Sequence, residues 1–116
     1  MVSKYLLDFA SKTYGFDINT LEHIPRSSGK IMNQIYTFNK DNKKYIIKFD
    51  PPSREHSDQL RETKAAMDFN YYLSENNVNV SIPIKTINGD LVISTQENGE
   101  DYIITALSKA IYPLIS

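Results

Sequence analysis

A lysine interrupts the apolar run at residues 45–49, "YIIKF". Lysine is among the residue types least often fully buried unless its charge is paired. Because side chains alternate along a strand, Ile46 and Lys48 share one face, and the other three residues share the opposite face. An ammonium group in the middle of an apolar run therefore raises the question of its role and of where its counter-charge comes from.

Glu62 is the natural partner for Lys48. Helical spacing places Glu62 on one stripe with Ala66, Phe69 and Leu73, and we expect this stripe to face the core. Removing one member of a buried ion pair costs about 3–5 kcal/mol, because the surviving charge is uncompensated. A purely structural pair satisfies this argument as well as a functional site does. A further alternative is that Lys48 extends its ammonium to solvent and that Glu62 lies at the rim of the stripe.

The elements that must position these residues follow from periodicity and turn signals. Gly15 is placed to end the first helix, and Asp41-Asn42, Asn88-Gly89 and Asn98-Gly99 supply turns between strand-like flanks. The expected elements are a helix over 2–13, strands over 35–40 and 44–49, a helix over 56–76, and strands flanking both Asn-Gly turns, the last over 101–107. This order predicts an α+β fold, in which an N-terminal helix and a long helix inserted after the third strand accompany an antiparallel five-stranded sheet.

Composition excludes several classes of function. The 116 residues carry 41% hydrophobic and 23% charged residues with a net charge of −1, which is ordinary for a globular domain. The sequence has no cysteine, and its two histidines, His23 and His56, have no ligand-like companions, so we expect no metal site. It has no basic cluster and no membrane-spanning run. We expect a cytoplasmic protein that binds neither nucleic acid nor membrane.

We expect a single domain over 1–116. Its parts are an N-terminal helix and link over 1–20, a loop and hairpin strands over 21–50, the long helix over 51–77, strands over 78–107, and a hinge and tail over 108–116.

The order of these features also matters. Protein-kinase-like enzymes hold ATP with a glycine-containing loop, followed by a strand with an interior lysine and then a helix with an inward glutamate. The expected elements of this sequence follow the same order. The segments "SSGKIMNQIYTFNKDNKKYIIKF", "RETKAAMDFNYYLSENNVNVSIPIKTINGDLV" and "DYIITALSKA" together resemble the aminoglycoside phosphotransferase-like family, which includes homoserine and choline kinases. The resemblance runs from about residue 27 to 110 and implies the N-terminal lobe of a kinase-like fold.

The resemblance implies a site for ATP, whose phosphates a small-molecule hydroxyl attacks in the family. Ser28, Gly29 and Lys30 match the loop over the phosphates, although the loop of the family is often richer in glycine. Lys48 matches the strand lysine and Glu62 the helix glutamate. The remaining matches are Ile46 for the apolar roof over adenine, and Ala106 with Leu107 for the hinge.

The sequence ends at Ser116, just past this expected hinge. The C-terminal lobe of the family, which carries the proton-accepting aspartate and the residues that hold Mg²⁺, has no counterpart here. We therefore expect no catalytic residue in this chain, and no phosphoryl transfer by the chain alone.

The alternative is a stand-alone interaction module or an inactive kinase relative, in which the Lys48–Glu62 pair is structural. The surface around Ile104, Leu107, Ile111 and Leu114, which a C-terminal lobe covers in the family, would then be hidden by a homodimer or another partner.

Overall fold

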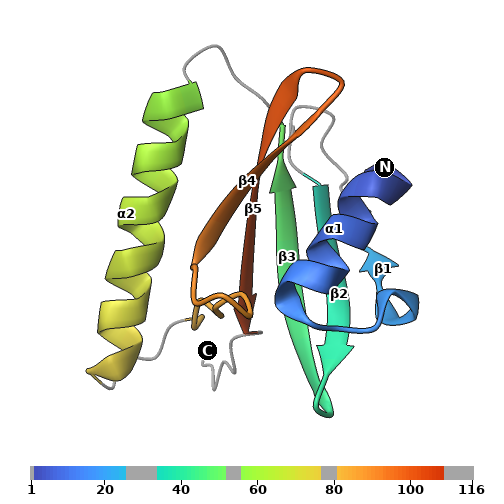
Figure 1. The fold of residues 1–116 in the computed structure, drawn as a ribbon. Helices are drawn as coiled ribbons and strands as arrows, with labels where there is room; N and C mark the ends of the chain where they lie inside the picture. Colours follow the sequence, from blue (N-terminus) through green and yellow to red (C-terminus); the bar gives the residue numbers. More distant parts are fainter. Residues whose placement is uncertain (1, 26–33, 52–55, 77–80, 109–116) are drawn as a thin grey trace.

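The computed structural model describes residues 2–25, 34–51, 56–76 and 81–108 (Figure 1). Its elements are α1 (Lys4–Tyr14), a 3-10 turn (Ile18–Thr20), β1 (Glu22–His23), β2 (Gln34–Lys40), β3 (Lys43–Asp50), α2 (His56–Glu75), β4 (Val92–Glu97) and β5 (Glu100–Ser108). The strands pair antiparallel in the order β1-β2-β3-β5-β4. The predicted α+β fold, a five-stranded antiparallel sheet with two helices, is confirmed.

Local sequence determines the limits of α1. The Ser3 hydroxyl accepts a hydrogen bond from the backbone N–H of Leu6 (3.3 Å), which satisfies one free donor of the first turn. At the other end, Gly15 adopts a left-handed conformation (φ 75°) and donates its N–H to the Ser11 carbonyl (2.9 Å). The prediction that Gly15 ends the helix is confirmed.

Two tight turns fix the register of the sheet. Asp41 and Asn42 both have positive φ (54° and 65°), as do Asn98 and Gly99 (55° and 79°). Two consecutive residues with positive φ give a turn whose twist matches that of the flanking antiparallel strands, so such turns are favoured in hairpins. The predicted β2–β3 and β4–β5 hairpins are confirmed.

The hairpin predicted at Asn88-Gly89 is wrong, although the turn itself forms. The Thr86 N–H donates to the Asp90 carbonyl (2.8 Å), but the residues before this turn do not pair with β4. Pro83 instead forms an isolated bridge with Leu107, beyond the point where β4 begins opposite Thr105. The segment before the turn therefore pairs with the part of that β5 edge that lies beyond β4.

The two helices cover opposite faces of the sheet (Figure 1). Residues of β5 alternate between them, since Ile104 and Ala106 join the core beneath α1, and Ile103 and Leu107 join a smaller cluster beneath α2. The α1 core consists of Leu6, Ala10, Tyr14, Phe16, Tyr36, Phe38, Ile47, Phe49, Ile104 and Ala106. The α2 cluster consists of Met67, Val92, Ile103 and Leu107, with Leu60 and Leu91 packed against it.

The stripe of α2 that we predicted to be buried is instead on the outside. Glu62 and Ala66 are exposed, and Phe69 is 59% exposed, whereas Met67 is buried. Leu60 and Met67, seven positions apart, form a different stripe that contacts the cluster of β4 and β5. Because α2 has apolar residues on two sides, periodicity alone could not show which side meets the sheet.

Candidate functional site

Lys48 lies on the face of the sheet that α2 partly covers. It stands directly opposite Thr105 of β5, and Ile46 stands opposite Leu107. Directly opposite residues of antiparallel strands point to the same face, and Leu107 belongs to the α2 cluster. The predicted alternation is confirmed, since Ile47 and Phe49 are buried in the α1 core. Sequence analysis missed Thr105, although alternation in "DYIITAL" places it on the same face as Leu107.

The expected ion pair between Lys48 and Glu62 is not formed. Among the described residues, the ion pairs within 4 Å are Lys44 with Glu22 (3.7 Å) and Arg61 with Asp58 (2.7 Å). Glu62 is exposed, and Lys48 is only half-buried. Because Lys48 is not fully buried, the cost of leaving its charge without a carboxylate is smaller than for a buried ammonium. The argument that required this pair assumed more complete burial than the fold provides.

On this face, the side chains of β2 and β3 are less buried than those on the opposite face beneath α1. Ile35 and Thr37 of β2 stand opposite Lys48 and Ile46, and all four side chains are half-buried. On the opposite face of the same strands the side chains beneath α1 are buried. In Figure 1, α2 stands beside β4, away from β2. The half-covered surface therefore combines aliphatic side chains with one ammonium group.

The two expected hinge residues point to opposite faces. Leu107 is 8% exposed and lies next to Ile46, but Ala106 is fully buried in the α1 core. The Ala106 carbonyl accepts a hydrogen bond from the Ile84 N–H (3.0 Å) within the extended edge of the sheet. This carbonyl is therefore already satisfied, while the Leu107 side chain remains near the Lys48 surface. Ser28, Gly29 and Lys30 lie outside the described residues.

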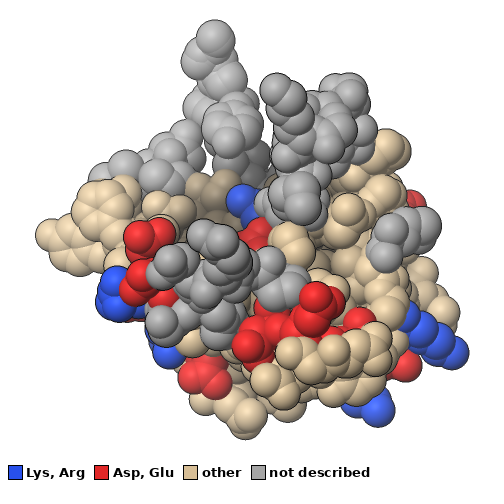
Figure 2. All heavy atoms as spheres, turned by 90° about the horizontal axis from the view of Figure 1, so that it is seen from above, with Lys and Arg blue, Asp and Glu red and all other residues tan. Residues whose placement is uncertain are grey.

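The acidic residues of the β4–β5 turn lie at a distance from Lys48. Figure 2 looks down on this end of the molecule, where acidic side chains gather and basic ones lie mostly toward the margins. The Glu97 carboxylate accepts a hydrogen bond from the Ser3 hydroxyl (2.5 Å), and Glu100 is exposed. Glu100 is five residues from Thr105 along β5, which corresponds to about 17 Å of strand. These carboxylates therefore stand apart from the Lys48 surface.

Two negative findings apply to the described residues alone. Within them, no group of three or more His, Asp or Glu side chains is arranged to hold a metal ion. No helix in those segments has the length and hydropathy needed to cross a membrane.

Comparison with known proteins gives matches in structure but not in sequence. No protein-family model matches the chain, and neither does any curated protein. Among solved structures, the amicoumacin kinase hAmiN in complex with AMP-PNP, Ca²⁺ and Ami aligns with a TM-score of 0.74 at 19% identity, over 95% of this chain. Spectinomycin phosphotransferase APH(9)-Ia in complex with ADP and spectinomycin aligns with a TM-score of 0.58 at 18% identity, over 97% of this chain.

The alignment covers 31% of each of these two kinases, so this chain spans about a third of their length. At such low identity the likeness shows the fold alone. It confirms the fold expected from the resemblance: the chain has a kinase-like fold similar to the N-terminal lobe of the aminoglycoside phosphotransferases.

Proposed function

We propose that this chain is the nucleotide-binding N-terminal lobe of an ATP-dependent phosphotransferase that acts on a small-molecule hydroxyl. The observation that carries the proposal is the half-buried Lys48 on a partly covered face, beside Ile46 and Leu107. An ammonium group next to an aliphatic surface fits a ligand that joins a flat base to phosphates. The two similar kinases, both solved with an adenine nucleotide or its analogue, support the same function.

Each residue has a distinct role in this proposal. The Lys48 ammonium binds phosphate oxygens, and Ile46 with Leu107 packs against adenine. Ser28, Gly29 and Lys30, which lie outside the described residues, also contact the phosphates, and Ala106 with Leu107 forms the hinge beside adenine. Glu62 lies on the exposed side of α2 and forms no ion pair with Lys48, so the proposal gives it no part in holding the lysine.

Catalysis requires parts that these residues do not supply. In this proposal a C-terminal lobe provides the proton-accepting aspartate, the residues that hold Mg²⁺ and most contacts to the acceptor. The chain by itself then binds ATP weakly and transfers no phosphoryl group, and the complete enzyme works in the cytoplasm, where ATP is available.

Calorimetric titration with ATP and Mg²⁺ tests this function. We expect Kd in the millimolar range, and about a tenfold loss of affinity in Lys48→Met, since a charge-assisted hydrogen bond contributes about 1.5–3 kcal/mol. Lys43→Met is the matched control, because Lys43 is exposed at the start of the same strand. Equal affinities for the wild type and Lys48→Met, or equal losses in both variants, would count against the proposal.

An interaction module is the second candidate, and one specific observation favours it. Phe69 and Tyr72 on the outer side of α2 are 59% and 60% exposed, which is unusual for neighbouring aromatic residues on one helix. Of the surface first expected to need a partner, two of the four residues are already covered within the chain. Ile104 is fully buried and Leu107 is 8% exposed within the chain, and Ile111 and Leu114 lie outside the described residues.

Sedimentation velocity over a wide range of concentrations distinguishes this second candidate. A self-associating module sediments as a dimer that Phe69→Glu converts to a monomer. A monomer at every concentration, with unchanged sedimentation of the variant, eliminates the homodimer.

A further inference from the structure

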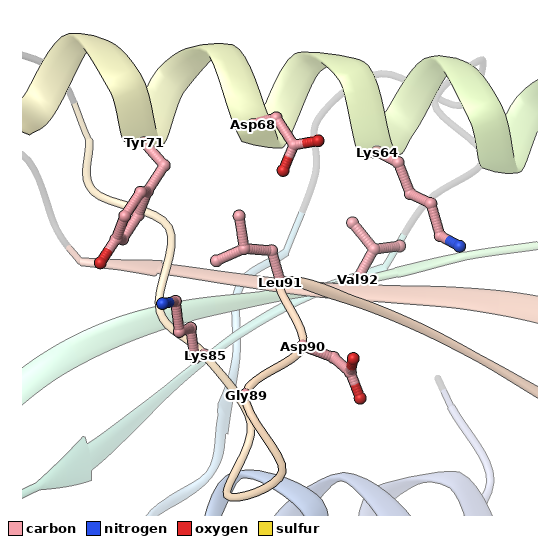
Figure 3. A pocket seen from close by; sticks show the side chains of 8 residues that line it. All are labelled: Lys64, Asp68, Tyr71, Lys85, Gly89, Asp90, Leu91 and Val92. Atoms are coloured by element: carbon pink, nitrogen blue, oxygen red, sulfur yellow. The ribbon is translucent and has the colours of Figure 1, made fainter.

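The two sides of α2 have different surroundings. On the inner side, the Lys85 ammonium lies over the ring of Tyr71, 4.9 Å from its centre (Figure 3). A hollow of about 370 Å³ between the helix and residues 85–92 also lies on this side. On the outer side, Phe69 and Tyr72 are 59% and 60% exposed. The described part of the chain therefore leaves most of these two aromatic side chains uncovered.

The exposed aromatic residues belong to one continuous stripe that runs along α2. The stripe, at steps of three and four residues, consists of Asp58, Glu62, Ala65, Phe69, Tyr72 and Asn76. Asp58 is half-buried, and the other members are exposed. A rise of about 1.5 Å per residue makes the stripe about 27 Å long. It lies opposite Leu60 and Met67, which face the sheet, and we call it the outer stripe.

The outer stripe is complementary to itself when two copies of α2 run antiparallel. A two-fold axis near residue 67 sets Ala65 of one copy against Phe69 of the other, so a small side chain leaves room for a large one. The same axis sets Glu62 against Tyr72, whose hydroxyl can donate to the carboxylate. In a parallel pair, Phe69 would meet Phe69, and Glu62 would meet Glu62. An isologous dimer requires a patch of this self-complementary kind, whereas a surface for an unrelated partner does not.

The charges beside the outer stripe also favour the antiparallel arrangement. Arg61 and Glu75 are exposed on the same flank of α2, near its two ends. An antiparallel pair brings Arg61 of each copy near Glu75 of the other, whereas a parallel pair would bring like charges together. Arg61 also pairs with Asp58 of its own helix (2.7 Å), and its guanidinium has further N–H groups to donate to a second carboxylate.

We propose that the outer stripe of α2 is a docking surface for a second copy of this chain, with the two helices antiparallel. Ala65, Phe69 and Tyr72 form the centre of the interface, and Arg61 with Glu75 forms its rim. This inference rests on the second candidate function above, to which it adds the partner and the orientation. Because the interface is about 27 Å long and one helix wide, it is small, and we expect a weak dimer with Kd of about 10–100 μM.

Single cysteines introduced into this cysteine-free chain report the orientation of the helices. With a short bis-maleimide linker, Ala65→Cys should cross-link to itself, because residue 65 lies close to the two-fold axis. Asp58→Cys should not, because the two copies of residue 58 are about 27 Å apart along an antiparallel pair. A mixture of Asp58→Cys with Asn76→Cys should form the mixed cross-link, because these residues meet at each end of the pair.

Exchange of the rim charges tests the same contact without a linker. Arg61→Glu and Glu75→Arg should each raise the Kd of the dimer about tenfold in sedimentation equilibrium, because each makes both ends of the interface repulsive. The double variant should return to within about twofold of the wild type, because the opposite charges meet again. Lys12→Glu, an exposed charge on α1, is the matched control and should leave the Kd unchanged.

Truncation of the central aromatic residue tests the middle of the interface. Phe69→Ala should raise the Kd of the dimer at least about tenfold, because a large exposed ring at the centre of a small interface carries much of its binding energy. Tyr5→Ala is the matched control, since Tyr5 is 52% exposed on α1 and should not change the Kd.

Any of three results would overturn the proposal. These are a chain that stays monomeric at every concentration, cross-linking of Asp58→Cys as efficient as that of Ala65→Cys, and a double charge variant as weak as its parents. A dimer that fails the last two tests would leave the second candidate function standing without this interface. A failure of ATP binding in the Lys48 experiment would not alter any of these results, so the two proposals can fail separately.

Discussion

The environment of Tyr14 differs strongly from that of a free tyrosine side chain. It is fully buried, and its hydroxyl has no hydrogen-bond partner among the described residues. Burial raises the pKa of Tyr14 far above its ordinary value of 10.0, and the nearby Asp90 carboxylate raises it further. The phenol therefore stays neutral in the folded state at a pH where the unfolded chain releases its proton.

The expected pH dependence follows from the direction of this shift. The contribution of Tyr14 to stability is fully present below pH 10.0 and decreases above it, by about 1.4 kcal/mol per pH unit, because the unfolded state alone ionises. Urea unfolding between neutral and strongly alkaline pH measures this slope. Tyr14→Phe should lose that part of the slope and should cost little stability at neutral pH, since no described hydrogen bond is removed. Parallel curves for variant and wild type would contradict this assignment.

Lys48 shows what the sequence could and could not predict for a single residue. Alternation in the strand predicted its face, because side chains in a strand have only two directions. Its burial depends on how far α2 extends over β2 and β3, which no local pattern specifies. The prediction of a paired charge therefore failed, although the prediction of the face was correct.

A double-mutant cycle checks the unpaired state of Lys48. Lys48→Met and Glu62→Gln should show a coupling energy in urea unfolding below about 0.3–0.5 kcal/mol, as expected for residues that share no contact. Arg61→Gln with Asp58→Asn, a pair separated by 2.7 Å, provides the reference for a formed surface ion pair. A coupling energy of about 1 kcal/mol or more between Lys48 and Glu62 would show that the pair exists in solution.

The elements divide into those with local signals and those without. Asp41-Asn42 and Asn98-Gly99 predicted their hairpins, because positive φ at both residues is a local preference of these residue types. Asn88-Gly89 carries the same signal, yet the segment before it does not pair with β4. Pro83 of this segment instead forms a bridge with Leu107. That outcome depends on which edge of β5 is free, and the sequence around the turn does not contain this information.

The orientation of α2 gives a prediction at the scale of the element. Met67→Ala should destabilise the fold by about 2–5 kcal/mol, because Met67 is 6% exposed within the cluster beneath α2. Phe69→Ala, although it removes a larger side chain, should change stability by less than about 0.5 kcal/mol, because Phe69 is 59% exposed. Thermal and urea unfolding of both variants measure the contrast. The reverse order would mean that the stripe with Glu62 faces the sheet, as first predicted.

For the whole molecule, the arrangement of two helices on one sheet explains why its two faces are covered to different extents. α1 covers β2 and β3 on one face, and α2 packs near β4 on the other, so the second face remains partly open around Lys48 (Figure 1). The similarity to two kinases of about three times the length concerns this fold alone. We propose that residues 1–116 form one domain of this type.

Mapping ATP binding by amide chemical shifts tests the central claim most directly. On titration of the ¹⁵N-labelled chain with ATP and Mg²⁺, the largest saturable shifts should occur at residues 46–48 and 105–108, and Lys48→Met should weaken them about tenfold. Absence of saturable shifts, or shifts confined to residues 64–71 and 85–92, would contradict a nucleotide site at Lys48.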